Sequence, residues 1–322
     1  MKIVLIGGGT GSYTLLQELK NWSKDITAIV NMCDDGGSSG SLRDELGVLP
    51  PGDVRQCLVA LSNHPETRDL FSYRFVNGTF SGHAVGNIIL SALELQTGSF
   101  IKAVDIVAEF LQITGRVIPV SSDNYTLELI DGSTVIKGEK NVIKHKIRNQ
   151  DAKIVLKPQP RLNPAAKKAI EEADLVIIAP GNLYGSLLPI LAIEDMASTL
   201  KMTHSKIIMI TNLVNKPGQT ENWHVVDYLK QMERYIGIGT IDTVLYNTKL
   251  PGKELLKKYA EDKEYPPNID QKEFKSIDTI FVGAPLVANK IHSPDPHDKM
   301  IRRTLIRHDA LEVLRQLKNL TY

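Results

Sequence analysis

The sequence predicts an α/β fold: a Rossmann-like parallel sheet with helices on both faces and an inserted small helical/β subdomain. Three observations lead to this prediction. A short apolar run at residues 2–6 ends in the glycine turn Gly7-Gly8-Gly9-Thr10-Gly11, and leucines at helical spacing follow. The same order of strand, turn and helix returns in the second half of the chain. The 322 residues are 42% hydrophobic and 23% charged, which excludes disordered, collagen-like and coiled-coil chains.

The expected parallel sheet is built from short continuous apolar runs, because such strands are buried on both faces. Six stretches fit, namely residues 2–6, 26–32, 174–179, 206–211, 241–246 and 277–282. Residues 247–275 alternate charged residues with Pro and Gly around a short expected helix at 254–261. We expect this segment to be a solvated connector, with a mobile lid or a partner surface as the alternatives. An amphipathic helix over residues 299–317 is expected to close the sheet.

The segment between the two halves has a different pattern. Residues 84–96 and 100–111 are mostly apolar and are expected to be helices. Short β-branched stretches then alternate with turn signals such as Asp131-Gly132, which predicts a small antiparallel insertion. Its expected strands are residues 117–120, 126–130, 134–136, 142–148 and 154–156. We therefore expect a nucleotide-binding half at 1–115, the insertion at 116–160, and the second half of the core with the C-terminal helix at 161–322.

The charge balance limits the classes of partner. Lys and Arg number 38 against 37 Asp and Glu, so the formal charge is +1. Without a global positive field we expect no nucleic-acid partner, and any anionic ligand must be bound locally. The two cysteines, Cys33 and Cys57, are too few for a disulfide framework. The apolar run at residues 2–6 is far shorter than the roughly 20 residues that a membrane span needs. We expect a cytoplasmic protein with no membrane span.

The glycine turn is the first candidate ligand site. Glycines between a strand and a helix allow close backbone approach, and the N–H groups at the helix start bind phosphate oxygens. Gly8, Gly9, Thr10 and Gly11 are therefore expected to contact a phosphate group. The pattern departs from the dinucleotide fingerprint at its third position, where Ser12 stands, so an ordinary strand-to-helix turn remains the alternative.

A pair of acids follows the second strand. Asp34 and Asp35 stand where a dinucleotide fold places the acid that binds a ribose hydroxyl. Together with the polar loop after them they could hold a hydroxyl or Mg²⁺. In that loop, Ser38, Ser39 and Arg43 are candidates for binding an anion. A flexible Gly/Ser spacer is the alternative.

Two further polar groups open apolar helices. Asp53 could be an N-cap or a ligand-binding acid. Arg55 falls in the first turn, where the helix dipole disfavours a cation, so it is expected to meet an anion. His83 and Asn87 form a polar notch that could contact a ligand or be packed.

Polar residues also follow two later strands. Gly181, Asn182 and Ser186 come after residues 174–179, and Asn212 comes after residues 206–211. Ligands of open α/β sheets bind at the carboxyl ends of the strands, so these residues are expected to face one crevice. No Walker P-loop, G-x-S-x-G, H-E-x-x-H or C-x-x-C motif occurs, so ordinary P-loop kinases, serine hydrolases and zinc enzymes have no supporting motif.

Taken together, these motifs resemble the gluconeogenesis factor family (the YvcK-like group), in the superfamily of 2-phospho-L-lactate transferase (CofD). The motifs in question are Gly7-Gly8-Gly9-Thr10-Gly11, Asp34-Asp35-Gly36-Gly37-Ser38-Ser39-Gly40-x-Leu42-Arg43, Pro51-Gly52-Asp53-x-Arg55, Gly82-His83-x-x-Gly86-Asn87 and Ala179-Pro180-Gly181-Asn182-Leu183-Tyr184. The resemblance implies a UDP-sugar or dinucleotide ligand, and a role in cell shape and wall synthesis during growth on gluconeogenic carbon.

The resemblance also implies roles for single residues. Gly8, Gly9 and Thr10 would contact the nucleotide, and Asp34 and Asp35 match acids that serve metal and acceptor binding in the transferases. The transferase branch has an acid-rich Pro-Asp segment after this pair, whereas this chain has a Ser-rich loop and Arg55. That departure argues against flavin-acceptor binding and coenzyme F420 chemistry.

Three function classes follow. The first is a regulator of cell shape and carbon metabolism that binds a nucleotide diphosphate. The second is a CofD-like, Mg-dependent transferase with Asp34, Asp35 and Asp53 as candidate catalytic residues. The third is an NAD-dependent oxidoreductase, which the altered fingerprint disfavours. A homodimer and a protein partner are left open.

Overall fold

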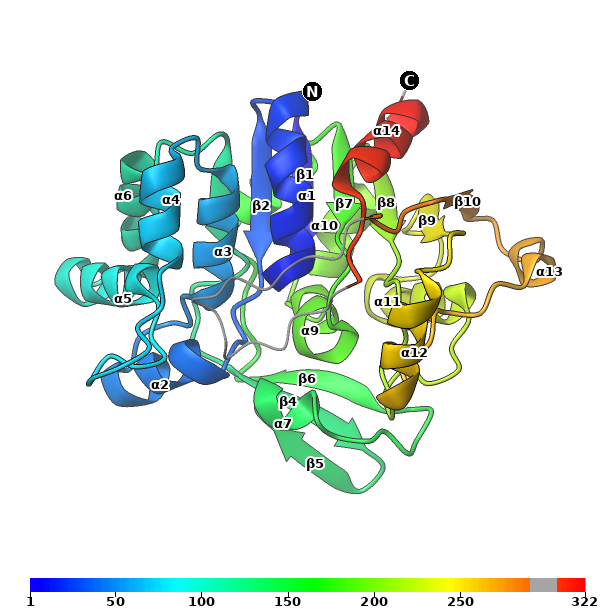
Figure 1. Cartoon of the computed structure of the whole chain (residues 1–322), viewed down its shortest axis with the longest axis horizontal. Coiled ribbons are helices and arrows are strands. Elements are labelled where there is room, and N and C mark those ends of the chain that lie inside the picture. The colour runs from blue at the N-terminus through cyan, green and yellow to red at the C-terminus, as the bar shows by residue number, and fades with distance from the viewer. Residues whose placement is uncertain (290–305, 322) are drawn as a thin grey trace.

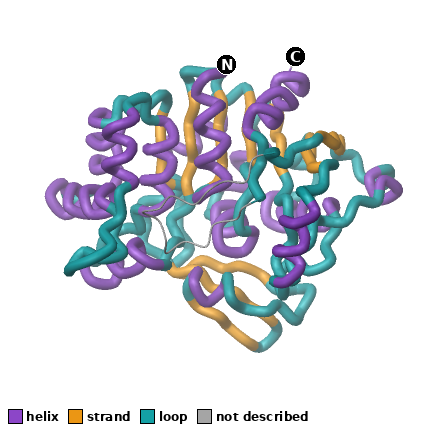
Figure 2. Tube along the Cα trace, viewed as in Figure 1, coloured by secondary structure: helices purple, strands orange, loops and turns teal. Residues whose placement is uncertain are grey.

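Seven parallel strands form the main sheet of the computed structural model, which describes residues 1–289 and 306–321 (Figures 1 and 2). The order across the sheet is β10-β9-β8-β7-β1-β2-β3, and every neighbouring pair is parallel. The strands are β1 (Ile3–Gly7), β2 (Ile26–Val30), β3 (Arg116–Pro119), β7 (Leu175–Ile178), β8 (Lys206–Ile210), β9 (Thr243–Asn247) and β10 (Ile280–Ala284). This confirms the predicted α/β fold class.

The direction of winding reverses at the centre of the sheet. The chain runs from β1 outward to β2 and β3, then returns to β7 beside β1 and continues outward through β8 and β9 to β10. Because crossovers between parallel strands are right-handed, this reversal puts the helices of the two halves on opposite faces. The carboxyl ends of β1 and β7 therefore form a topological switch point, the usual ligand crevice of such sheets.

Helices cover both faces. On one face α1 (Gly9–Trp22) packs against α3 (Gly52–Leu61) and α14 (Ala310–Thr321), and on the other α10 (Met196–Met202) packs against α8 (Pro164–Glu171) and α11 (Val225–Ile236). The remaining helices are α2 (Gly37–Leu46), α4 (Pro65–Ser72), α5 (Val85–Thr97), α6 (Phe100–Phe110), the π-helical turn η1 (Leu183–Leu187), α9 (Leu188–Leu191), α12 (Lys253–Glu261) and α13 (Gln271–Phe274). In the described part of the chain, no helix has the length and apolar character needed to cross a bilayer.

The core is centred on β1. Ile3, Val4, Leu5 and Ile6 are each at most 2% exposed, because helices cover this strand on both faces. At the edge strand β10, by contrast, Ile280 is 56% exposed. The continuous apolar runs that predicted the strands are therefore a direct consequence of burial on both sides.

The insertion forms a second, antiparallel sheet of order β5-β4-β6, which lies at the bottom of Figure 1. Its strands are β4 (Thr126–Asp131), β5 (Thr134–Lys137) and β6 (Lys153–Lys157), with the short helix α7 (Glu139–Val142) between β5 and β6. Two expectations about it are wrong. Residues 117–120 fall on β3, which pairs in parallel with β2 in the main sheet. Residues 142–148 are not a strand, because they wrap around the Asp131 carboxylate described below.

The helices agree more closely with prediction. Residues 84–96, 100–111 and 254–261 correspond to α5, α6 and α12. The polar loop expected after Asp35 is instead the start of α2, which begins at Gly37. Of the predicted C-terminal helix, residues 299–305 lie outside the described residues. Residues 306–309 are not helical, and α14 begins at Ala310 and packs against α1.

Candidate functional site

A cavity of about 390 Å³ lies at the carboxyl ends of β1, β7 and β8. Eight of the residues that the sequence analysis nominated as ligand contacts line it, namely Gly8, Gly9, Thr10, Gly11, Gly181, Asn182, Ser186 and Asn212. Its volume falls in the range of roughly 300–1,000 Å³ that is typical of small-molecule sites. The structure thus brings three separate sequence motifs to one wall.

The glycine turn forms the side of the cavity nearest β1. Gly9 has φ +65°, a backbone conformation that favours glycine, and it begins α1 with no side-chain cap from Gly8. A Cβ on Gly11 would lie 2.0 Å from the Pro180 carbonyl oxygen, so the turn packs directly on the loop after β7. The start of α1 therefore lines the cavity without a capping side chain from its own N-cap residue.

Asn212 joins the loop after β8 to the loop after β7, and Asn182 stabilises the loop after β7 itself. The Asn212 side chain accepts a hydrogen bond from the Gly181 amide at 3.0 Å and donates one to the Gly181 carbonyl at 2.8 Å. Asn182 accepts a hydrogen bond from the Gly185 amide at 2.8 Å. These side chains shape the wall and leave the cavity open between the loops.

The cavity is also lined by titratable residues that the sequence analysis did not nominate. Lys216 donates to the Ile143 carbonyl of the insertion, and burial lowers the pKa of its ammonium group. His308 hydrogen-bonds to the Thr211 carbonyl at 3.1 Å, and burial lowers its pKa to about 4, so the imidazole is neutral at pH 7. Glu264 and Arg307 line the same cavity. Lys216 follows the polar 211–215 motif directly and could have been found, whereas no pattern indicated His308.

The nominated acids lie close together beside the glycine turn, next to an acid of the insertion. Asp34, Asp35, Asp53 and Glu139 form what we call the acid cluster, in which each carboxylate influences its neighbours electrostatically. None of the four lines the cavity. Asp53 connects the two regions, because a Cβ on Gly8 would lie 2.3 Å from its Oδ2. Asp53 is not an N-cap: Pro51 is the N-cap of α3, and the Asp53 carboxylate accepts a hydrogen bond from the Gly9 amide instead.

Burial raises the pKa of three members of the acid cluster, Asp34, Asp53 and Glu139. It raises the pKa of Asp53 to about 7, assisted by the Asp34 charge and opposed by the Gly9 amide and by Arg55. Burial, and then the charges of Asp34, Asp53 and Asp35, raise the pKa of Glu139 to about 9. The pKa of Asp34 is also raised by burial. Glu139 is therefore protonated at neutral pH.

Asp35 holds the insertion against the core. Its Oδ1 accepts a hydrogen bond from the Lys140 amide at 2.7 Å, at the start of α7. This contact places the neighbouring Glu139 within the acid cluster. Glu139 gave no sequence signal, because it reaches the cluster through the folding of a separate sheet.

A chain of hydrogen bonds joins several nominated polar residues to one another. Arg55 Nε donates to the side-chain oxygen Oδ1 of Asn87 at 2.8 Å. The Asn87 side-chain amide in turn donates to Ser38 Oγ at 3.0 Å, and Ser38 Oγ lies 3.1 Å from His83 Nδ1. Asp34 is hydrogen-bonded to Ser39 and lies near Arg55. The anions that Arg55 meets in this structure are thus carboxylates of the acid cluster, Asp34 and Asp53.

Arg43 lies apart from both regions. Its guanidinium donates to the Tyr125 carbonyl at 2.9 Å and to the Asn124 side chain at 3.3 Å. It therefore connects α2 to the segment before β4. Arg43 does not line the cavity that contains the glycine turn.

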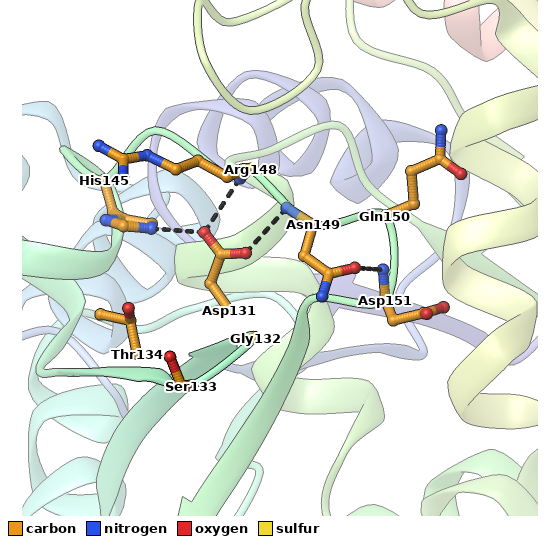
Figure 3. Close-up of a pocket in the computed structure, with 9 residues that line it drawn as sticks. All are labelled: Asp131, Gly132, Ser133, Thr134, His145, Arg148, Asn149, Gln150 and Asp151. Carbon is orange, nitrogen blue, oxygen red and sulfur yellow. Dashed lines mark hydrogen bonds and ion pairs between the residues drawn. The ribbon is translucent and has the colours of Figure 1, made fainter.

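A larger hollow of about 670 Å³ lies on the insertion around Asp131 (Figure 3). The Asp131 carboxylate is fully engaged there: it contacts His145 Nε2 at 2.8 Å and accepts the amides of Arg148 at 3.0 Å and Asn149 at 2.9 Å. Burial raises its pKa, but the His145 and amide hydrogen bonds more than offset this, and the net pKa is lowered. This hollow is a consequence of the loop that encircles Asp131, so the smaller cavity at the sheet is the better candidate site.

Comparison with known proteins identifies the family. The family model of 2-phospho-L-lactate transferase CofD matches residues 3–287. A gluconeogenesis factor of Bacillus subtilis is 36% identical over 99% of this chain and 98% of its own, and one of Listeria innocua is 39% identical over 87% of both. A solved Bacillus halodurans structure, described as a member of the UPF0052 family, has a TM-score of 0.88 at 31% identity and covers 98% of both chains. The chain therefore belongs to the CofD family, and within it to the group of the gluconeogenesis factors.

Proposed function

We propose that the cavity binds a nucleotide diphosphate ligand, a UDP-sugar or a dinucleotide, and that the protein is a regulator rather than an enzyme. The observation that carries this proposal is the start of α1, whose N-cap residue Gly8 has no capping side chain and which lines a cavity that also contains Lys216. The helix dipole favours an anion at that point, as do the amides of the first turn beyond Gly9, and the Lys216 ammonium group adds attraction. A diphosphate fits this arrangement without a metal ion.

The regulatory part of the proposal rests on the polar residues beyond the glycine turn. Arg55, Asn87, Ser38 and His83 hydrogen-bond among themselves, and Asp35 is engaged by the Lys140 amide. Groups held in this way support a rigid site more than they support chemistry on a bound molecule. The name that the curated relatives share, gluconeogenesis factor, supports a role in carbon metabolism, which we extend to cell shape and wall synthesis.

Thermal denaturation and calorimetric titration test ligand binding. UDP-glucose, UDP-N-acetylglucosamine and NAD are each added to the whole chain, with inorganic phosphate as the comparison. A ligand present at about 100 times its Kd should add roughly 2.7 kcal/mol of stability. If phosphate stabilised the protein and none of the three nucleotides did, the proposal would be wrong.

A charge variant tests where the diphosphate lies. Lys216→Gln removes the ammonium group of the cavity wall, and the loss of a charge-assisted hydrogen bond should weaken nucleotide binding by about 1.5–3 kcal/mol. The matched control is Lys230→Gln, at an exposed position on α11. Equal affinity for the two variants would place the diphosphate away from Lys216.

A second candidate function, a Mg-dependent transferase, is favoured by the acid cluster. Among the described residues no group of three or more His, Cys, Asp or Glu is arranged to hold a metal ion. The buried Asn31 Oδ1, however, has no hydrogen-bond partner there, and Asn31 lies beside Gly8, as Asp53 does. Asp53 lies against Gly8 and Asp34 acts on it electrostatically, so these two acids are the candidates to hold Mg²⁺ with a ligand phosphate.

Phosphorus NMR separates the two functions. In a transferase, Mg²⁺ would neutralise charge on the transferred phosphoryl group, so the donor should be consumed over hours and Asp53→Asn should stop its consumption. In a regulator, the donor signals remain unchanged with Mg²⁺ or with EDTA. Donor consumption that requires both Mg²⁺ and Asp53 would overturn the regulatory proposal.

A further inference from the structure

Glu264 is an acid in the cavity wall that no motif indicated. It lies just after α12, is half-buried, and lines the cavity together with the loops after β7 and β8. Its carboxylate makes no hydrogen bond to any residue of 1–289 or 306–321. Among these residues, Asp262 and Lys216 are the charged groups that influence it electrostatically. Asn212 and His308, in the same wall, are engaged by backbone groups. Glu264 is therefore available to a ligand.

The backbone holds Glu264 in place. Its amide donates to the Tyr259 carbonyl at 2.9 Å, and the carbonyl of the next residue, Tyr265, accepts a hydrogen bond from the Asn215 amide at 2.7 Å. Asn215 belongs to the loop after β8. Glu264 is thus anchored to the β8 side of the cavity and not to the side of the glycine turn.

The sheet sets the distance between these two sides. Adjacent strands are about 4.8 Å apart, so the end of β8 lies two strand spacings, or roughly 10 Å, from the end of β1. That distance suits a nucleotide whose diphosphate lies at the glycine turn and whose nucleoside extends across β7 and β8. At the β8 end the anionic Glu264 side chain would attract hydrogen-bond donors, while its neighbour Lys216 supplies the positive charge that favours the diphosphate.

We propose that Glu264 recognises the nucleoside half of the ligand by accepting hydrogen bonds from it. The donors are either the ribose cis-diol or the N–H edge of the base, and both present the same chemistry to a carboxylate. This inference rests on the proposed function. It transfers to Glu264 the ribose-binding role that the sequence pattern assigned to Asp34 and Asp35, which lie outside this cavity.

The test compares Glu264→Gln with Glu261→Gln, an exposed position on α12. UDP-glucose, its 2′-deoxyribose analogue, NAD and inorganic pyrophosphate are titrated calorimetrically into each protein. Glu264→Gln should lose about 10- to 100-fold in affinity for UDP-glucose, because hydrogen bonds to a charged acceptor are replaced by weaker ones. Its affinity for pyrophosphate should not fall, since this probe lacks a nucleoside. Glu261→Gln should match the wild type throughout.

The deoxyribose analogue distinguishes the two sources of donors. If Glu264 binds the ribose, the loss caused by Glu264→Gln should be smaller for the analogue than for UDP-glucose, because the analogue lacks one of the two diol donors. If Glu264 binds the base, the loss should be the same for both ligands. Wild-type affinity of Glu264→Gln for both UDP-glucose and NAD would overturn the inference while leaving the proposed function intact. A parallel loss of pyrophosphate binding would also overturn it, because Glu264 would then be supporting the fold of the site. If no nucleotide binds the wild type, the inference and the proposed function are both wrong.

Discussion

The acid cluster should make the folded protein less stable as the pH rises, and Glu139→Gln tests this directly. The pKa of Glu139 is raised to about 9 in the fold, against 4.5 for the ordinary side chain. Between these values the folded state binds a proton that the unfolded state has released. Stability therefore falls with rising pH across this window, by about 1.4 kcal/mol per pH unit for each retained proton.

The magnitude of the effect follows from that slope. Between about pH 6 and pH 8, one retained proton is expected to cost roughly 3 kcal/mol of stability. Glutamine keeps the size of Glu139 and cannot ionise, so Glu139→Gln should lose that much less than the wild type over this interval. Asp53, whose pKa is about 7, remains in both proteins and adds a common contribution.

Urea denaturation at several pH values measures the difference. The control is Glu45→Gln, on an exposed part of α2, which should keep the wild-type pH dependence. Identical pH slopes for wild type and Glu139→Gln would refute the argument. So would a wild-type stability that rises between pH 6 and pH 8, because Glu139 would then be ionised in the fold.

Two further substitutions test the packing around the glycine turn. Arg55→Met removes the cation beside Asp34 and Asp53, and should lower the free energy of unfolding by about 3–5 kcal/mol at neutral pH. Part of this loss should be recovered in acid, because the carboxylates then become protonated. A loss that does not depend on pH would contradict this. Gly11→Ala places a Cβ against the Pro180 carbonyl. It should lower the free energy of unfolding, measured by chemical denaturation, by about 1–3 kcal/mol, and should also weaken nucleotide binding. A stability equal to that of the wild type would mean that the loop after β7 moves freely.

The main sheet was predictable because its strands are buried on both faces. Continuous apolar runs therefore marked six of its strands, and the glycine turn marked the crossover from β1 to α1. The seventh strand, β3, was assigned to the insertion because residues 117–120 lie next to the β4 and β5 pattern in the sequence. Its pairing with β2 is a long-range contact that local patterns do not encode.

The candidate site was predictable where motifs follow strands. Gly9, Gly181 and Asn212 meet in one cavity because β1, β7 and β8 are neighbours in the sheet. Glu139 and His308 were missed because each arrives from a segment remote in sequence, with no spacing that relates it to the glycine turn. Local spacing also could not indicate that Asp34 and the cavity lie on different sides of Gly8.

Amide hydrogen exchange on the whole chain tests the central claim, that a nucleotide diphosphate binds with its diphosphate at the glycine turn. The chain is saturated with whichever of UDP-glucose, UDP-N-acetylglucosamine and NAD gives the largest thermal shift, and exchange is compared with and without it. We predict that protection increases in peptides covering residues 8–14 and 212–220, which line the cavity, and remains unchanged in residues 65–80. Protection confined to residues 37–46 and 83–91, around α2 and the start of α5, with none at the glycine turn, would contradict the account.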